Sequence, residues 1–290
     1  MSRLIVALLW LLHWLPLCIQ APIGRGLGKL LYWLIPGRRK VVLTNLRLCF
    51  PEKSEAERRA LAREHFALAG RSLIERGLAW FAPAERIRQL VRIEGEERLR
   101  ALVDGGQPVI LLAPHFLGLD LGGTRIAMSF DSVSIYARQR DAVIDRWLYH
   151  GRSRFGDQLL LRRDESIRSS IKAIKACRPF YYLPDMDHGA HESVFVPFFG
   201  VQAATLAALP RFAKLGGAVV VPCITEILPG GAGYVVRFEE AWQDFPGESV
   251  EEDARRMNTC IEDHIRRIPA QYYWVHRRFK TRPPGEPKIY

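Results

Sequence analysis

A histidine and an aspartate follow a short apolar segment near the middle of the chain, in the order Ala113-Pro114-His115-Phe116-Leu117-Gly118-Leu119-Asp120. The apolar segment, residues 108–113, has turn residues on both sides and is typical of a strand buried on both faces. Ligands of open α/β sheets bind beyond the carboxyl ends of strands, where His115 is expected. A tight turn would bring the Asp120 carboxylate to the imidazole, fix its tautomer and leave the other ring nitrogen free as a general base.

The spacing alone leaves a second interpretation open, in which Asp120 caps the following helix and His115 is satisfied by backbone groups. The sequence contains no G-x-S-x-G motif, and no cysteine lies near His115. A histidine–aspartate pair without a nucleophile indicates a base that activates a hydroxyl of the substrate. Direct acyl transfer to that hydroxyl fits this arrangement.

A second polar cluster has the spacing D-x-D-H-x-x-H and consists of Asp185, Asp187, His188 and His191. Carboxylate and imidazole groups suit Zn²⁺ or Mn²⁺, so a metal site is one interpretation. Adjacent residues seldom all bind one ion. We therefore expect a polar loop that lines the site and no metal, with a solvated loop as the remaining alternative.

Basic and aromatic residues alternate close to the C-terminus, where residues 271–283 read QYYWVHRRFKTRP. Arginine side chains bind phosphates and carboxylates well, so Arg277, Arg278 and Lys280 are candidates for contact with an anionic substrate. The interleaved aromatic residues leave structural packing open as the other interpretation.

The composition fits a large folded core, because 48% of the 290 residues are hydrophobic. The 42 Lys and Arg residues exceed the 31 Asp and Glu residues by 11, which indicates an anionic partner, either nucleic acid or an anionic membrane surface. No zinc-finger or RNP-like motif is present, so we expect no nucleic acid. Five widely spaced cysteines without a CxxC pair exclude a disulfide scaffold and suit a reducing compartment.

The N-terminus is strongly apolar, with an uncharged run over residues 4–19 and a second patch over 27–35. The run is shorter than the ~20 residues needed to cross a bilayer, and a cleaved signal or a buried core helix are alternatives. We expect a retained membrane anchor, spanning or half-inserted, because aromatic residues suit the interface: Trp10, Trp14, Tyr32 and Trp33. Basic residues follow the run, which predicts that the body of the chain lies in the cytoplasm.

The rest of the chain alternates between helical and strand patterns. Ser54 and Glu57 predict a capping box for a helix over 54–80. Apolar segments predict strands at 108–113, 132–136, 180–183, 218–224 and 234–238, and amphipathic segments between them predict crossover helices. The predicted fold class is α/β, with a mixed, mostly parallel sheet flanked by helices and an N-terminal hydrophobic membrane-anchor helix. We expect an anchor and interfacial helix over 1–35 and a single α/β domain over 36–290, with a helical lead-in over 36–90.

The H-x-x-x-x-D box after an apolar strand resembles the glycerolipid acyltransferase superfamily. Three further segments, TNLRLCFP (44–51), LPDMDHG (183–189) and VFVPFFG (194–200), together with 271–283, are similar to the late acyltransferases of lipid A biosynthesis, the lauroyl/myristoyl transferase family. The resemblance implies a Gram-negative inner-membrane enzyme that faces the cytoplasm and needs no cofactor. The implied reaction moves a fatty acyl chain from acyl carrier protein to a hydroxyl of an acyl chain on the Kdo-bearing lipid A precursor, forming an acyloxyacyl ester.

The resemblance also assigns expected roles to single residues. His115 matches the catalytic histidine, Asp120 its acidic partner, and Asp185 and Asp187 the acidic loop that lines the site.

A basic residue expected after the following strand falls on Arg138, with Arg140 as the alternate. This arginine, or backbone N–H groups near Gly118, is expected to stabilise the oxyanion. A different lipid acceptor, such as a lysophospholipid or an aminolipid, remains an alternative within the same chemistry.

Overall fold

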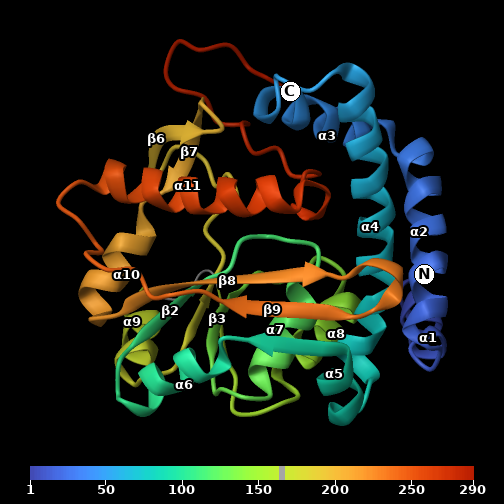
Figure 1. Cartoon of the computed structure of the whole chain (residues 1–290), viewed down its shortest axis with the longest axis horizontal. Coiled ribbons are helices and arrows are strands. Elements are labelled where there is room, and N and C mark those ends of the chain that lie inside the picture. Colours follow the sequence, from blue (N-terminus) through green and yellow to red (C-terminus); the bar gives the residue numbers. More distant parts are fainter. Residues whose placement is uncertain (163–166) are drawn as a thin grey trace.

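A seven-stranded sheet organises the computed structural model, which describes residues 1–162 and 167–290 (Figure 1). Neighbouring strands run parallel except at the antiparallel pair β8–β9, so β1 and β9 run opposite to the other five. The strand order is β1 (Val91–Glu94), β9 (Tyr234–Phe238), β8 (Val219–Ile227), β2 (Val109–Leu112), β5 (Phe180–Tyr182), β3 (Val133–Tyr136) and β4 (Leu159–Arg162). The predicted α/β class with a mixed, mostly parallel sheet is confirmed.

The central strand β2 shows why the sheet is buried on both faces. All four of its side chains are shielded from solvent. Successive side chains of a strand point to opposite faces. Val109 and Leu111 therefore join one hydrophobic core, and Ile110 and Leu112 join the other.

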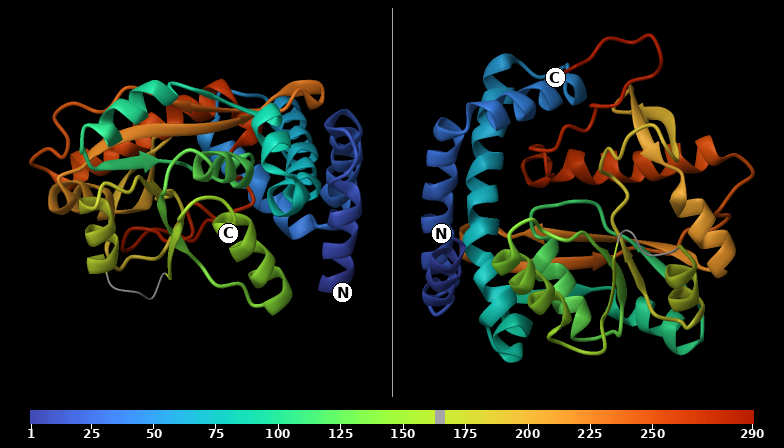
Figure 2. Two further views of the ribbon diagram at one scale, coloured as in Figure 1. Left: turned by 90° about the horizontal axis from the view of Figure 1, so that it is seen from below. Right: turned by 180° about the vertical axis from the view of Figure 1, so that it is seen from behind.

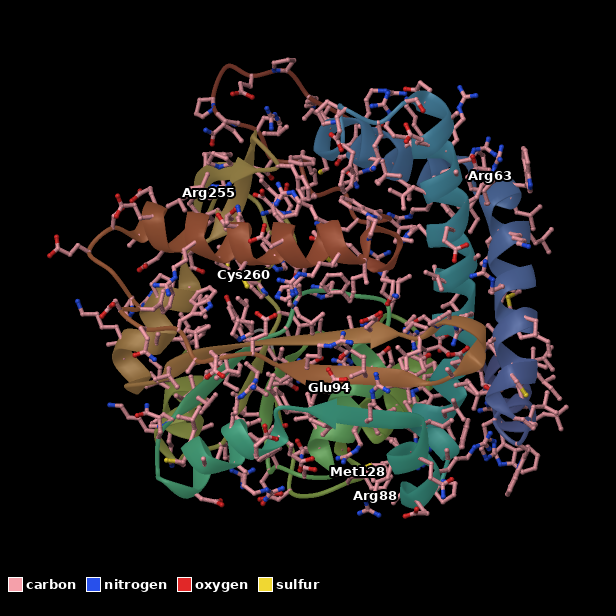
Figure 3. The ribbon with its side chains drawn as sticks, in the orientation of Figure 1. Arg63, Arg88, Glu94, Met128, Arg255 and Cys260 are labelled. Carbon is pink, nitrogen blue, oxygen red and sulfur yellow. The ribbon has the colours of Figure 1, made fainter. Side chains whose placement is uncertain are left out.

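Helices cover each face of the sheet and enclose the two cores. One core contains side chains of α6 (Glu96–Asp104), α7 (Leu119–Ala127) and α8 (Ala142–Ser153). The other contains side chains of α9 (Ile167–Lys175), α10 (Ala208–Gly216) and α11 (Val250–Arg267). Figure 3 shows the side chains between α11 and the sheet, among them Cys260, which packs against the second core.

The long helix α4 (Glu55–Phe81) lies along one side of the sheet, with α1 (Ser2–Leu12) and α2 (Leu17–Leu34) outside it (Figures 1 and 2). Its predicted capping box is confirmed, because the Ser54 hydroxyl accepts from Glu57 N–H and the Glu57 carboxylate accepts from Ser54 N–H. Helices α2 and α4 pack closely at glycines: a Cβ on Gly28 would lie 1.9 Å from the Phe66 carbonyl oxygen. Two shorter helices, α3 (Pro36–Cys49) and α5 (Ala84–Leu90), flank α4 in sequence.

The apolar N-terminus is divided into two helices and does not form one long anchor helix. Pro16 precedes α2, and α2 itself carries Arg25 and Lys29. No helix within residues 1–162 and 167–290 is long and apolar enough to cross a membrane. The expected spanning anchor is therefore not supported by the structure.

A two-stranded antiparallel hairpin, β6 (Ser193–Phe198) and β7 (Val201–Leu206), stands apart from the main sheet and packs against α11. Phe199 and Gly200 form its two-residue turn and both have positive φ, as tight hairpin turns require. The segment after the short 3₁₀ turn at Pro269–Gln271 then passes between this hairpin and the loop that carries His115. The hairpin and this segment frame the candidate site.

Candidate active site

His115 lies in the loop that joins β2 to α7, immediately beyond the carboxyl end of β2. The C-terminal segment fixes the backbone of this loop. The N–H of Tyr273 donates to the His115 carbonyl at 2.9 Å, and the N–H of Leu117 donates to the Gln271 carbonyl at 2.8 Å. The Ser72 hydroxyl of α4 also donates to the Leu117 carbonyl at 2.7 Å. The His115 side chain stays 21% exposed, so its ring is held in place and is still open to a substrate.

The carboxylate of Asp185 is the partner of the His115 ring. Its Oδ1 lies 2.7 Å from His115 Nδ1, and its Oδ2 accepts from the His115 backbone N–H at 3.0 Å. Asp185 follows β5, which pairs with β2 in parallel, so both loops leave the same edge of the sheet. The Asp185 side chain is only 1% exposed. The sequence predicted that Asp185 lines the site but gave no sign that it contacts the imidazole.

The surroundings of Asp185 favour the ionised form of its side chain. Burial alone would raise its pKa, but the charge of His115 and the hydrogen bonds from the His115 ring, the His115 backbone and the Tyr272 hydroxyl outweigh burial. Together they lower the pKa of Asp185 to about 2. An ionised carboxylate on Nδ1 leaves Nε2 as the ring nitrogen that can accept a proton from a substrate.

Asp120 does not take the position that its spacing from His115 predicts. Its Oδ2 lies 2.9 Å from Arg76 Nη2, and its Oδ1 lies 3.3 Å from Arg152 Nη2. Burial raises the pKa of Asp120, but the two arginines outweigh burial and lower it. The predicted hydrogen bond between Asp120 and His115 is therefore wrong.

Asp120 lies in the first turn of α7, next to α4 and α8. These two helices supply Arg76 and Arg152, so the Asp120 carboxylate pairs with them and not with His115. A carboxylate in the first turn of a helix is favoured by the helix dipole.

The candidates for oxyanion stabilisation lie in different surroundings. Arg138 has a side chain that is 71% exposed, and its Nε lies 3.9 Å from Asp145 Oδ2. Arg140 is also exposed, and no hydrogen bond or ion pair among the described residues joins either arginine to His115. Gly118 precedes α7, where a Cβ would lie 2.9 Å from Thr225 Cγ2, so close packing requires a glycine. The expected role of Arg138, Arg140 and Gly118 in stabilising the oxyanion stays a prediction.

Asp187 holds the C-terminal segment and does not contact His115. Its carboxylate accepts from the Thr281 N–H at 2.7 Å and from the Thr281 hydroxyl at 2.8 Å, and Lys280 Nζ lies 3.9 Å away. Its own N–H donates to His276 Nε2 at 2.8 Å. Burial lowers the pKa of His276 to about 4, which keeps this ring neutral and able to accept.

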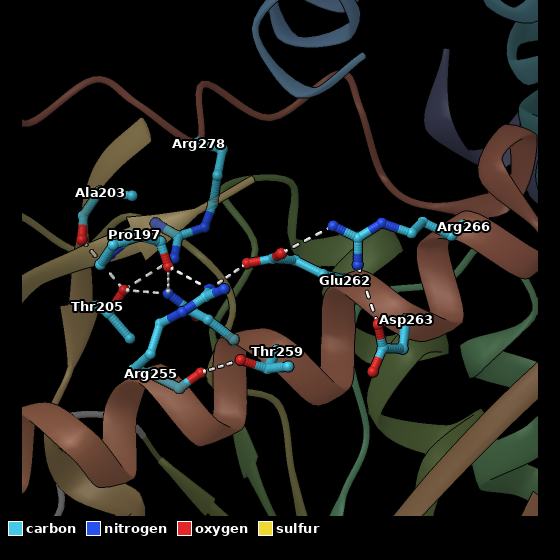
Figure 4. Close-up of polar contacts among 10 residues, drawn as sticks. Pro197, Ala203, Thr205, Arg255, Thr259, Glu262, Asp263, Arg266 and Arg278 are labelled. Carbon is cyan, nitrogen blue, oxygen red and sulfur yellow. Dashed lines mark hydrogen bonds and ion pairs between the residues drawn. The ribbon is translucent and has the colours of Figure 1, made fainter. Parts of the chain in front are cut away.

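Arg278 is buried in the frame of the site, which favours the packing interpretation for this residue. Only 1% of the residue is exposed. Its Nη1 donates to the Ala204 carbonyl at 2.7 Å. Its Nη2 donates to the Thr205 hydroxyl at 3.0 Å, and Figure 4 shows both of these side chains. Arg277 is exposed and lines an open hollow of about 490 Å³ with Arg38.

The aspartates of the D-x-D-H-x-x-H cluster have separate partners, because Asp185 binds His115 and Asp187 binds Thr281. Within residues 1–162 and 167–290, no three His, Cys, Asp or Glu side chains are grouped to hold a metal ion. The residues that sequence reasoning missed at this site are Tyr272, Arg76 and Arg152. Each of them comes from an element far from His115 in sequence. Tyr272 belongs to the aromatic and basic segment 271–283, but nothing in that segment marks it as a partner of Asp185, and no local motif marks Arg76 or Arg152.

A histidine–carboxylate pair at the carboxyl edge of a parallel sheet belongs to a class of site that can carry out general-base chemistry. A family model described as bacterial lipid A biosynthesis acyltransferase matches residues 1–281, and the chain belongs to this family. Membership makes the protein an acyltransferase of lipid A biosynthesis.

Three characterised relatives are similar over nearly the whole chain. The lipid A biosynthesis lauroyltransferase of Escherichia coli (strain K12) is 38% identical over 286 residues, which cover 98% of this chain and 93% of that protein. The palmitoleoyltransferase of the same organism is 30% identical over 98% of this chain and 92% of that protein. Its myristoyltransferase is 34% identical over 94% of this chain and 83% of that protein.

Proposed function

We propose that the protein transfers a fatty acyl chain from acyl carrier protein to a hydroxyl of an acyl chain on the Kdo–lipid A precursor. The product is a secondary acyloxyacyl ester. The observation that carries this proposal is the His115–Asp185 pair, because it presents one free ring nitrogen at an accessible edge of the sheet. The relatives named as lauroyl-, palmitoleoyl- and myristoyltransferases support a fatty acyl chain as the group transferred.

The chemistry proceeds through the Nε2 atom of His115. Nε2 takes the proton from the acceptor hydroxyl as its oxygen attacks the thioester carbonyl, and Asp185 stabilises the imidazolium that forms. The tetrahedral intermediate then loses the thiolate as the carbon–sulfur bond breaks. The thiolate receives the proton from the imidazolium, so the ester forms and His115 returns to its neutral state.

We place the protein on the cytoplasmic side of the inner membrane, with α1 and α2 lying at the membrane surface. These helices and the residues directly after them expose many large apolar side chains, each at least 40% accessible: Leu4, Ile5, Leu8, Trp10, Leu11, Trp14, Ile19, Ile23, Leu30, Trp33, Leu34 and Ile35. Soluble proteins rarely expose an apolar patch of that extent, and interfacial helices bury such a face among lipid headgroups. The net charge of +11 favours anionic lipid and an acidic carrier protein.

Mass spectrometry of lipid A tests the function in cells that lack the protein. We expect the loss of one secondary acyl chain, restored by the wild-type protein and not by His115→Ala. His150→Ala is the matched control, because His150 is an exposed histidine of α8. Equal restoration by His115→Ala would contradict the mechanism.

The second candidate function keeps His115 as the base and changes the acceptor to a lysophospholipid or an aminolipid. The whole-lipid extract of the same cells separates the two. Unchanged lipid A together with altered phospholipids or aminolipids would favour the second acceptor class.

A further inference from the structure

The open hollow of about 490 Å³ lies where α2 ends, between the start of α3 and the C-terminal segment. Figure 1 shows the C-terminus beside α3. The hollow is lined by Ile35, Gly37, Arg38, Val41 and Arg277. Its volume is within the roughly 300–1,000 Å³ of sites that hold small molecules. The hollow is therefore large enough for a polar headgroup, and two arginines supply its charge.

Both arginines of the hollow are exposed and have donors to spare. A guanidinium carries five N–H donors in a planar fork that matches a phosphate. Arg38 uses Nη1 to donate to the Val275 carbonyl at 3.1 Å, and the guanidinium of Arg277 lies 5.8 Å from the centre of the Tyr290 ring. Among the described residues neither arginine forms an ion pair with a carboxylate, whereas Lys280 in the same C-terminal segment lies 3.9 Å from Asp187.

The sequence explains why this charge has no local compensation. Residues 1–51 contain seven Lys and Arg residues and no Asp or Glu. Residues 270–285 contain four Lys and Arg residues and again no Asp or Glu. The structure brings these two segments together at the hollow. Positive charge that gathers without carboxylates attracts an anion from outside the protein.

One rim of the hollow is apolar. Ile35 lines the hollow and is exposed, and it follows the exposed Trp33 and Leu34. The guanidinium of Arg39 lies 5.5 Å from the centre of the Trp33 ring, so it is held against α2. Trp33, Leu34 and Ile35 belong to the apolar surface that we place at the membrane. The hollow thus joins a basic site to the edge of that surface.

This combination fits an anionic amphiphile better than a soluble anion. A soluble anion would contact the two arginines and leave the apolar rim in water. An anionic phospholipid carries a phosphate joined through glycerol to hydrocarbon chains, so it can contact both parts. Such lipids are present in the layer where interfacial helices lie, and basic residues beside an apolar helix face are attracted to their headgroups.

We propose that Arg38 and Arg277 bind the headgroup phosphate of an anionic membrane phospholipid in this hollow, with the hydrocarbon chains of the lipid beside Trp33, Leu34 and Ile35. The inference rests on the placement of α1 and α2 at the membrane surface under the proposed function, and it does not depend on the transfer reaction. A headgroup bound at one end of α2 holds that end in the headgroup layer. The site therefore fixes how the protein is turned on the membrane.

The test is the dissociation constant of the full-length protein from two kinds of vesicle, measured by co-sedimentation. One kind contains phosphatidylcholine alone, and the other contains equal parts of phosphatidylcholine and phosphatidylglycerol. We expect the wild-type protein to bind the anionic vesicles more tightly. A basic residue near an anionic membrane surface strengthens binding by about fivefold. Arg38→Gln combined with Arg277→Gln should therefore weaken binding to the anionic vesicles by about 25-fold and leave binding to the neutral vesicles unchanged.

Two matched pairs separate a headgroup site from general attraction of charge. Arg211→Gln combined with Lys214→Gln removes the same charge from exposed positions of α10, which lies at the other end of the molecule from α2 (Figure 1), and should change binding by less than about twofold. Arg38→Lys combined with Arg277→Lys keeps both charges and loses the planar forks, so it should still weaken binding to the anionic vesicles by about threefold or more.

Wild-type binding by the lysine pair, or an equal loss in the α10 pair, would overturn the headgroup site. If the wild-type protein binds neutral vesicles and gains nothing from phosphatidylglycerol, the site fails while the membrane placement stands. If it binds neither vesicle, the placement fails and the site with it. A glutamine pair that binds vesicles normally and raises KM for the lipid A precursor would assign the hollow to the acceptor and refute the proposal.

Thermal unfolding shows whether each variant is folded. Arg38 donates to a backbone carbonyl, so its substitution can disturb the C-terminal segment. In that case Arg277→Gln alone decides the question, with an expected loss of about fivefold on anionic vesicles. No loss in this single variant would then refute the proposal.

Discussion

In the proposed mechanism Asp185 positions the His115 ring through two hydrogen bonds, and its replacement by asparagine tests that role most directly. The substitution removes the negative charge beside Nδ1 and keeps the size of the side chain. The surroundings lower the pKa of Asp185 from 3.8 to about 2. At about 1.36 kcal/mol per pH unit, this difference corresponds to roughly 2 kcal/mol in favour of the ionised carboxylate. A hydrogen bond to a charged group contributes roughly 1.5–3 kcal/mol, and each 1.36 kcal/mol in a barrier is tenfold in rate, so Asp185→Asn should lower kcat by about 10- to 150-fold.

The assay is the initial rate of acyl transfer by the purified protein, with kcat and KM measured separately. We expect the loss to fall on kcat with little change in KM, because Asp185 stabilises the charged ring and does not hold the acyl chain. Asp120→Asn is the matched comparison, since it removes an aspartate of the same region whose partners are Arg76 and Arg152.

A spectroscopic signature separates the two aspartates independently of rate. The proton between His115 Nδ1 and Asp185 should give a downfield NMR signal that Asp185→Asn removes and Asp120→Asn keeps. Thermal unfolding of both variants shows whether each is folded. The reasoning is refuted if Asp185→Asn keeps the wild-type kcat, or if it is Asp120→Asn that removes the Nδ1 proton signal.

Three further predictions concern stability and are read from thermal or urea unfolding. Arg278→Ala should lower the free energy of unfolding by about 3 kcal/mol, because it leaves buried acceptors without a donor. Arg277→Ala removes an exposed neighbour and should change the free energy of unfolding by less than about 0.5 kcal/mol. Equal effects of the two substitutions would contradict the buried placement of Arg278. Burial lowers the pKa of His65 to about 4, so the unfolded chain binds a proton that the folded chain refuses, and stability should fall as the pH drops from about 6.5 to 4, by up to about 1.4 kcal/mol per pH unit. His65→Gln should flatten this slope, and an unchanged slope would exclude His65 as its source. Gly28→Ala should destabilise by several kcal/mol through its clash with α4, while Gly26→Ala should stabilise by about 0.5–1 kcal/mol; similar effects of the two would argue against the close α2–α4 packing.

The elements that the sequence predicts well have strong local signals. The strand predicted at 234–238 coincides with β9, and the one predicted at 108–113 contains β2, because a short apolar run between turn residues has few other interpretations. The capping box at Ser54 is equally local, since its two hydrogen bonds join residues three apart.

The hairpin β6–β7 is not among the elements predicted from the sequence. Pro197 lies inside β6, and a proline within an apolar run argues against a strand. The structure accommodates it because, among the described strands, β6 pairs with β7 alone. The Pro197 carbonyl accepts hydrogen bonds from Arg255 and Asn258 of α11. These partners are about 60 residues away, so the sequence carries no local signal for them.

The carboxylate partner of His115 was misassigned for the same reason. Asp120 is five residues away and was favoured by proximity in sequence, while Asp185 is 70 residues away and is brought close only by the pairing of β2 with β5. Strand order within a sheet is a tertiary property. A pattern around one strand can therefore locate the base, and it cannot choose between two aspartates that follow different elements.

The same geometry changes the meaning of the aromatic and basic segment near the C-terminus. Tyr272 donates to Asp185, and the N–H of Tyr273 holds the His115 carbonyl. His276 and Thr281 fix Asp187, two residues beyond Asp185. Read as a row of charges, the segment predicts anion binding. Its contacts instead hold the loop that carries His115 and the loop that carries Asp185 at hydrogen-bonding distance. Substitutions in this segment should therefore affect the His115–Asp185 pair before they affect any substrate contact.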